Sequence, residues 1–266
     1  MASGQPGGGL QTLPGRSCSQ RDIIMRLYFI RHGQSVNNAL WEENRSDADR
    51  SEDPELTATG HEQARLLAEY ILKTDTQAKS NGKRGEQKRD YFGITHLYTS
   101  LMVRSVATAS YISRALDLPL LGWPEIHECG GIYIDSDNEE ERIGRPGKNR
   151  AYFAKHYAHL QLPETVGDEG WWNNRPFEVD EDRPIRARSV LETMIERHGG
   201  TDDVVAIVSH GGFYMEFSRV LFNIGEGRSW FVMHNTGVSR FEFRPNQEKV
   251  LYYHNRTEHL PDHLVT

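Results

Sequence analysis

The chain contains little cysteine and no excess of positive charge. Its 266 residues include only two cysteines, Cys18 and Cys129, too few for the disulfide framework of a small secreted protein. The composition fits a reducing compartment, so we expect a cytoplasmic protein and interpret Cys129 as a small buried or half-buried residue rather than a reactive thiol. The formal net charge of -7 argues against a nucleic-acid-binding protein, which usually carries a basic face.

Long apolar runs and common metal-binding motifs are also missing. The longest apolar stretches, such as 204–208, have the length of a strand, whereas about 20 residues are needed to cross a bilayer; we expect no membrane association. No His-Glu-x-x-His sequence or paired-cysteine spacing occurs, so we expect no metal and no cofactor. The segment 210–213 resembles the oxyanion-hole segment of esterases, but the chain lacks their Gly-x-Ser-x-Gly nucleophile elbow, which disfavours that class.

The N-terminal segment differs in composition from the rest of the chain. Residues 1–9 are rich in Gly, Ser and Pro and show no apolar periodicity, so we interpret 1–25 as a tail. It lacks the apolar core of a secretory signal. Because it is poor in acids and carries Arg16 and Arg21, an organellar transit segment stays open. We expect residues 26–266 to form a single domain.

Short apolar runs alternate with helical patterns along that domain. Strands are expected at 27–30, 94–98, 119–123, 204–208, 241–243 and 250–253. Helices are expected after residue 60, after a Thr99-Ser100 cap, around 187–194 and after residue 212, and a solvated loop at 73–90. The alternation indicates an α/β fold, a three-layer α/β/α sandwich with a mostly parallel central sheet. The segment 130–183 breaks the pattern, and we interpret it as a lid-like insertion with one helix near 152–157.

Two of the expected strands end in a histidine followed by glycine, at His32 and His210. In α/β sheets the ligand site lies beyond the carboxyl ends of the strands, so both histidines should face one crevice. Arg31 precedes His32, and its guanidinium offers a planar fork of donors that matches phosphate oxygens. A neutral imidazole is a competent nucleophile towards phosphorus when its other nitrogen is held by a hydrogen bond. The residues therefore suit phosphoryl transfer.

The sequence resembles the histidine phosphatase superfamily, which includes the phosphoglycerate mutases. The matching blocks stand in the family's order: 27–35 with Asn38, Leu56-Thr57 with Gly60, Tyr98-Thr99-Ser100 with Arg104 and Thr108, Val208-Ser209-His210-Gly211, and Asn235-Thr236. The resemblance implies a phosphoglycerate mutase-like fold and a metal-independent phosphatase. Its substrate would be a small-molecule phosphomonoester.

The resemblance also implies roles for individual residues. His32 would be the nucleophile that becomes phosphohistidine, and Arg31 and Arg104 would bind the phosphoryl oxygens. His210 would contact the same group and stabilise charge in the transition state. Asn38 matches a position that can hydrogen-bond the phosphate.

The general acid would be a carboxylate after the third strand. Glu128, with glycines just behind it, matches the family better than Glu125, which stays the alternative. His127, between the two, is interpreted as a structural neighbour.

Two alternatives to a phosphatase stay open. One is a mutase-type phosphotransferase, and the other is a catalytically weak module of the same fold that binds a phosphorylated ligand. Mutases carry a basic residue and a His-Tyr pair after the acid, whereas Cys129 follows Glu128 here and 130–183 holds more acids than bases, which favours a phosphatase. Tyr133, Trp171 and Trp172 could contact an organic leaving group or simply pack within the insertion. A homodimer is also left open.

Overall fold

We analysed a computed structural model of the chain, which describes residues 25–45, 50–80, 91–136, 141–225, 229–244, 246 and 248–266. The expected tail, 1–25, lies outside the described residues except for Met25, which begins the first strand. Residues 81–90 of the expected loop also lie outside them.

A seven-stranded sheet forms the centre of the molecule, in the order β6-β3-β2-β7-β1-β8-β9. Its strands are β1 (Met25–Arg31), β2 (His96–Thr99), β3 (Leu120–Gly122), β6 (Leu160–Gln161), β7 (Val204–Ser209), β8 (Val238–Phe243) and β9 (Lys249–Arg256). Neighbours from β6 to β1 are parallel, whereas β8 is antiparallel to both β1 and β9. The expected mostly parallel sheet is confirmed.

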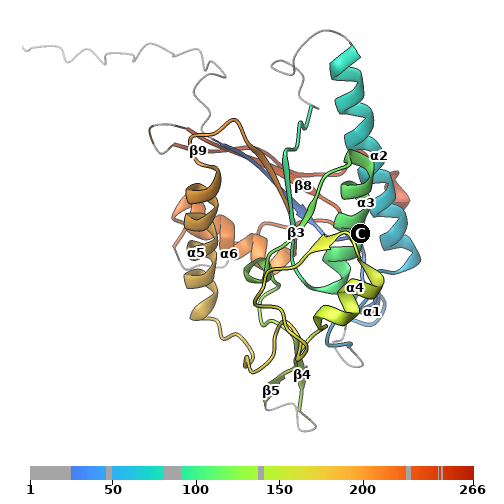
Figure 1. Cartoon of the computed structure of the whole chain (residues 1–266), viewed down its shortest axis with the longest axis vertical. Helices are drawn as coiled ribbons and strands as arrows, with labels where there is room; N and C mark the ends of the chain where they lie inside the picture. The colour runs from blue at the N-terminus through green and yellow to red at the C-terminus, as the bar shows by residue number, and fades with distance from the viewer. Residues whose placement is uncertain are drawn as a thin grey trace, which may run out of the picture.

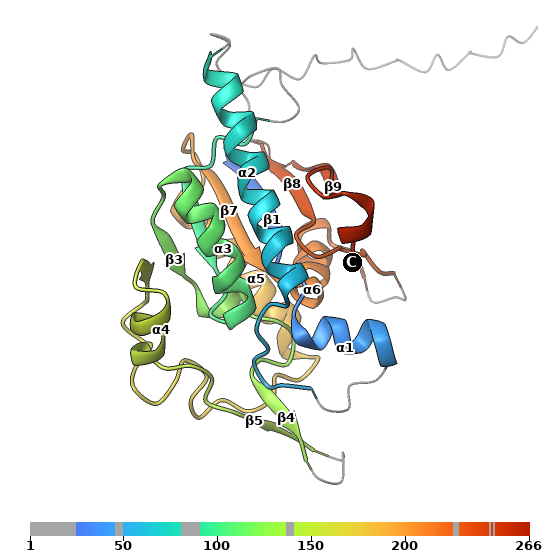
Figure 2. The same cartoon turned by 90° about the vertical axis from the view of Figure 1, so that its right-hand side faces the viewer.

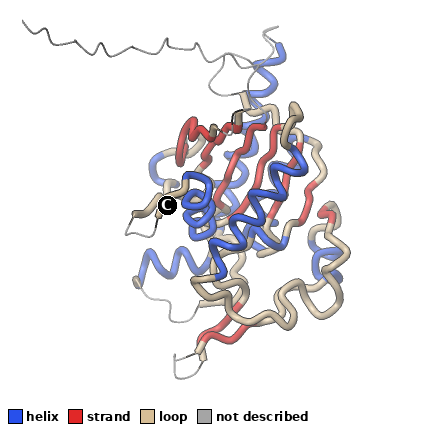
Figure 3. The backbone as a smooth tube through the Cα atoms, turned by 90° about the vertical axis from the view of Figure 1, so that its left-hand side faces the viewer, coloured by secondary structure: helices blue, strands red, loops and turns tan. Residues whose placement is uncertain are grey.

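Helices cover both faces of this sheet (Figures 1 and 3). On one face lie α2 (Ala58–Ser80) and α3 (Val103–Leu116), and on the other α5 (Asp182–His198) and α6 (Gly211–Phe222). Side chains of β1 alternate between the two layers: Tyr28 and Ile30 join the core with α2 and α3, whereas Leu27 and Phe29 join the core with α5 and α6. Burial on both faces explains why the sequence of β1 is a continuous apolar run.

The remaining elements gather at the end of the molecule where β1 leads into α1 (Figure 2). They are α1 (Val36–Asn44), the 3-10 turn η2 (Pro124–Ile126), the antiparallel pair β4 (Tyr133–Asp135) and β5 (Arg142–Gly144), and α4 (Arg150–His156). The C-terminal turn η3 spans Asp262–Leu264. No helix of the described residues is both long and apolar enough to cross a membrane.

The structure departs from the expected elements in the loop from residue 73 and in the segment 130–183, as well as at the start of α3, which is described below. The loop expected from residue 73 is helical as far as Ser80, because Asp75 anchors this last part of α2: its carboxylate accepts the backbone N–H groups of Phe92 (2.9 Å) and Gly93 (3.1 Å). Within 130–183, β6 pairs with β3 at the edge of the main sheet. A two-residue strand is too short to show a period in the sequence.

Candidate active site

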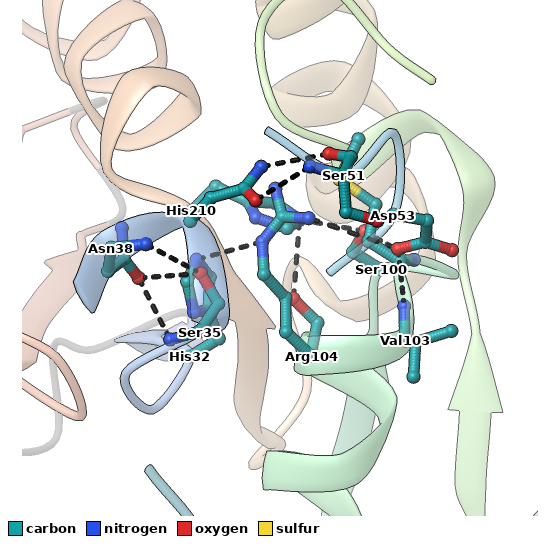
Figure 4. A network of polar contacts seen from close by, with 12 residues as sticks. His32, Ser35, Asn38, Ser51, Asp53, Ser100, Val103, Arg104 and His210 are labelled. Carbon is teal, nitrogen blue, oxygen red and sulfur yellow. Dashed lines mark hydrogen bonds and ion pairs between the residues drawn. The ribbon is translucent and has the colours of Figure 1, made fainter. Parts of the chain in front are cut away.

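The two strand-end histidines lie together at the carboxyl edge of the sheet (Figure 4). β1 and β7 are parallel neighbours with Arg31 opposite Ser209, so the residues that follow, His32 and His210, leave the sheet side by side. Their ring centroids are 5.1 Å apart. Arg104, in the first turn of α3, reaches the same point.

The hydrogen bonds of His32 define its tautomer. Nδ1 lies 2.6 Å from the carbonyl oxygen of Gly33, which can only accept, so Nδ1 carries the proton and donates it. Nε2 therefore keeps its lone pair and accepts the Nε–H of Arg104 at 3.1 Å. Burial, together with the positive charges of Arg104 and Arg31, holds the pKa of His32 well below its ordinary value of 6.5. The ring is thus neutral near pH 7, with Nε2 as the nucleophilic atom.

His210 and Arg31 each hold a buried side-chain nitrogen without a partner among the described residues. Nε2 of His210 lies 2.9 Å from the hydroxyl of Ser100 and 3.2 Å from that of Ser105, whereas Nδ1 is buried with no partner among the described residues. Burial, Arg104 and His32 hold the pKa of His210 well below 6.5. Arg31 donates from Nη1 to the carbonyl oxygen of Met233 at 2.5 Å, while its Nε is buried and equally unpaired within the described part of the chain. Buried polar groups are normally hydrogen-bonded, so two orphaned groups beside one nucleophile are suited to an anionic ligand.

Arg104 is positioned by a carboxylate that the sequence pattern did not reveal. Oδ1 of Asp53 lies 3.9 Å from Nη1 of Arg104 and accepts the N–H of Val103 at 3.0 Å. Asp53, rather than the expected Thr99-Ser100 cap, therefore satisfies the start of α3. Burial raises the pKa of Asp53 to about 6, although Arg104 acts in the opposite direction.

Glu128 lies at the N-terminus of α6. Its carboxylate accepts three backbone N–H groups, those of Cys129 (2.8 Å), Phe213 (2.9 Å) and Gly212 (3.2 Å). Such a site favours an anion, because helix N-terminal N–H groups lack intrahelical partners. A Cβ on Gly212 would come within 2.4 Å of Oε1 of Glu128, so only glycine permits this approach.

Glu125, the alternative acid, lies in a different environment. Its side chain is 45% exposed and reaches Arg175 at 4.0 Å. In contrast, the charge of Glu128 acts on both Arg31 and Arg104, which raises the pKa of each and partly offsets the lowering by burial. The structure therefore brings Glu128, and not Glu125, together with the arginines.

Asn38 supports the loop that carries His32. Its Oδ1 accepts the backbone N–H of Ser35 at 3.1 Å, which closes a capping box at the start of α1. The same oxygen lies 3.2 Å from Nδ2 of Asn235, and this Nδ2 donates to the carbonyl oxygen of His32 at 3.0 Å. A contact between Asn38 and phosphate stays a prediction.

The other matching blocks support the same loop. A Cβ on Gly33 would lie 2.5 Å from the carbonyl oxygen of Gly60, so the two backbones meet where a side chain would not fit. Thr108 accepts the N–H of Gly33 at 3.0 Å. The N–H of Thr236 lies 3.1 Å from the carbonyl oxygen of Arg31. These residues fix the backbone on both sides of His32.

The aromatic residues of 130–183 mainly pack. Trp171 and Trp172 are each 4% exposed, and the ring of Trp172 packs edge-on against His127 with centroids 4.5 Å apart. A Cβ on Gly131 would collide with Trp172 at 2.1 Å. Tyr133 accepts a hydrogen bond from Arg50, whose guanidinium also lies 4.3 Å from the ring centroid. Packing is therefore the better interpretation of the two tryptophans.

Comparisons of the sequence with known proteins found one matching family and one relative. A model of the histidine phosphatase superfamily (branch 1) matches residues 27–256. The probable phosphoglycerate mutase GpmB of Serratia proteamaculans is 30% identical over 105 residues, which make up 40% of this chain and only 38% of that relative.

Solved structures resemble most of the chain in fold. A phosphoserine phosphatase of Entamoeba histolytica, in complex with 3-phosphoglyceric acid, has a TM-score of 0.52 at 21% identity, covering 89% of this chain and 100% of that one. A mycobacterial glucosyl-3-phosphoglycerate phosphatase, in complex with inorganic phosphate, has a TM-score of 0.53 at 17% identity, covering 89% and 99%. Identities this low support the shared fold and no finer likeness.

Proposed function

The chain belongs to the histidine phosphatase superfamily (branch 1), and from this premise we propose that it hydrolyses a small-molecule phosphomonoester through a phosphohistidine at Nε2 of His32. The observation that carries the proposal is the tautomer of His32. Its Nδ1–H is held by Gly33 and its Nε2 lone pair faces Arg104, and Arg31 and His210 each keep a buried nitrogen without a partner among the described residues.

In the first step the substrate phosphate takes over the Nε–H of Arg104, which frees the lone pair of His32. Nε2 attacks phosphorus, and the bond to the leaving oxygen breaks. The Gly33 carbonyl stabilises the positive ring that forms, and Nδ1 of His210 and Nε of Arg31 donate to the phosphoryl oxygens. Since these donors are fixed before the reaction, they stabilise the transition state with little reorganisation.

In the proposed cycle Glu128 enters protonated and gives its carboxyl proton to the leaving oxygen, and the N–H groups of Cys129, Gly212 and Phe213 stabilise the carboxylate that remains. In the second step it accepts a proton from the water that attacks phosphohistidine, which releases inorganic phosphate and restores His32. The two arginines supply the positive charge that balances the phosphate, so the proposal requires no metal. Activity should therefore survive treatment with a chelator.

We further propose that 26–266 acts as one domain in which the segment 130–183 covers the site. The hydrogen bond between Arg50, in the loop that leads to Asp53, and Tyr133, in β4, supports this arrangement. A phosphatase is favoured over a mutase because Cys129, half-buried beside Glu128, stands where mutases carry a basic residue. Burial and the charge of Glu128 both raise the pKa of its thiol, which keeps it neutral.

A panel of phosphomonoesters tests the proposal, with wild type, His32→Ala and a control, His61→Ala. His61 is an exposed histidine on α2 whose nearest polar partner is the hydroxyl of Tyr111. Wild type and the control should release inorganic phosphate from at least one ester, and His32→Ala from none. Interconversion of phosphoglycerates without phosphate release would indicate a mutase. Binding of an ester without turnover would indicate a binding module.

A further inference from the structure

Three side chains that commonly bind metals meet at the end of the sheet opposite to the active site. His96 is the first residue of β2, His198 is the last residue of α5, and Asp203 directly precedes β7. One ligand atom from each lies within 4.8 Å of the other two, and within the described ranges no other such group of three was found.

The distances between these atoms suit a small tetrahedral ion. Nδ1 of His198 lies 2.9 Å from Oδ2 of Asp203, and Nδ1 of His96 lies 3.6 Å from Oδ1. In a tetrahedral zinc site with bonds of about 2.0–2.1 Å, neighbouring ligand atoms are about 3.3 Å apart. The observed distances bracket that value, so small side-chain movements would complete the geometry.

We propose that His96, His198 and Asp203 form a binding site for Zn²⁺ or a similar divalent transition metal. Two imidazoles and one carboxylate are donors that this class of ion prefers, whereas Mg²⁺ and Ca²⁺ prefer oxygen alone. The side chains of His96 and Asp203 are 37% and 25% exposed, so water can supply the fourth ligand. The site is separate from the phosphatase chemistry and does not depend on it.

A partner behind His198 orients its ring. The hydroxyl of Tyr98 lies 3.1 Å from Nε2 of His198, on the side away from Asp203. Without a metal, Nδ1 of His198 donates to the Asp203 carboxylate, so Nε2 accepts the hydroxyl of Tyr98. Metal binding at Nδ1 would move this proton to Nε2, where the oxygen of Tyr98 can accept it, as outer partners of ligating histidines usually do. Tyr98 is itself buried, so the ring is fixed before any metal binds.

The turn before β7 fixes the carboxylate in the same way. The hydroxyl of Thr201 donates to the carbonyl oxygen of His198 at 2.8 Å and accepts the N–H of Asp203 at 3.0 Å. Two ligands are therefore joined by a short, hydrogen-bonded turn, and His96 approaches from a neighbouring strand. A bound ion would tie β2, α5 and β7 together.

The hydroxyl of Thr95 would compete with a metal ion for Nδ1 of His96. The hydroxyl of Thr95 lies 2.9 Å from Nδ1 of His96 and 3.2 Å from the carbonyl oxygen of Val204. In the tautomer that leaves Nδ1 of His96 unprotonated, this hydroxyl has a single proton for two acceptors. When His96 binds the ion, the proton goes to Val204, so the hydroxyl keeps a partner.

Calorimetric titration of Zn²⁺ into the chelator-treated full chain, at neutral pH, tests the site. Wild type should bind one equivalent, and Zn²⁺ should raise its melting temperature because the ion binds only the folded state. His96→Gln and Asp203→Asn remove a ligand each, and each should weaken binding at least about tenfold, as removal of a mere outer partner already costs about 10–100-fold. His263→Gln, an exposed histidine in η3, is the matched control and should leave binding unchanged.

Two further variants distinguish a built metal site from adventitious binding elsewhere on the chain. Tyr98→Phe should weaken Zn²⁺ binding without removing a ligand, which a role for Tyr98 in packing alone would not produce. His32→Ala should retain full binding. The proposal is overturned if wild type does not bind Zn²⁺, or if binding persists undiminished in His96→Gln and Asp203→Asn, whether or not His32→Ala still binds.

Discussion

Replacement of Glu128 by glutamine should slow the phosphorylation of His32 to an extent that depends on the leaving group. An alkoxide leaves poorly and needs a proton as the bond breaks, whereas p-nitrophenolate needs almost none. The phosphorylation rate for an alkyl phosphate should therefore fall by about 10²–10⁴-fold, the usual contribution of a general acid. The rate for p-nitrophenyl phosphate should change little.

The same substitution should also reduce the folding free energy. Glutamine keeps one acceptor for Cys129 and Phe213, but its NH₂ group would face the N–H of Gly212, which Oε2 now accepts at 3.2 Å. Loss of this bond should cost about 1–3 kcal/mol of folding free energy. Urea unfolding should therefore accompany the kinetics, so that a loss of folded enzyme is not mistaken for a loss of catalysis.

Pre-steady-state bursts are the appropriate assay, because they report phosphorylation of His32 before water attacks. Glu125→Gln is the matched control, since Glu125 is close in sequence but half-exposed beside Arg175. If the burst rates of both substrates fall equally in Glu128→Gln, Glu128 is not the acid. A leaving-group-dependent fall in Glu125→Gln would assign the role to Glu125 instead.

Three other predictions concern neighbouring groups. Arg104→Lys should lower kcat as well as weaken binding, because a point charge cannot reproduce the donor fork; near-normal steady-state kinetics would contradict this role. The pKa of His32 lies well below 6.5, so the burst rate should stay constant as the pH is lowered through 6.5, and a fall there would show that the ring takes up a proton. Asp53 has a pKa of about 6 when folded and near its ordinary value of 3.8 when unfolded, so the folded state binds more protons in between. Its ionisation should therefore reduce the unfolding free energy by about 2 kcal/mol as the pH rises from 4 to 6. Urea unfolding of Asp53→Asn should lack this decline, and an unchanged pH profile would refute it.

The sequence was informative where function depends on residues at strand ends. The runs before His32 and His210 are long and apolar enough to identify buried parallel strands, and the geometry of such sheets then requires both histidines to meet. Arg104 follows the same logic, since it stands in the first turn of the helix after β2. The alternation of strands and helices likewise predicted the layered fold.

Other features depend on contacts between distant segments and leave no local signal. Asp53 reaches the start of α3 at Val103, 50 residues further along the chain, so nothing around Asp53 reveals its partner. The last part of α2 is stabilised by hydrogen bonds from residues beyond a loop to Asp75. The placement of Glu128 on the N-terminus of α6 depends in the same way on Gly212, which looks like an ordinary glycine in the sequence.

The most direct test of the proposed chemistry is to trap the phosphorylated enzyme. Wild type and His32→Ala would be mixed with a phosphate-labelled ester that wild type hydrolyses and quenched in alkali, where phosphohistidine survives. Peptide mapping by mass spectrometry would then locate the label. We predict a phosphoryl group on Nε2 of His32 in wild type, formed within the burst, and no label in the variant. Turnover by wild type without any phosphorylation of His32, or label on a different residue, would contradict the proposal.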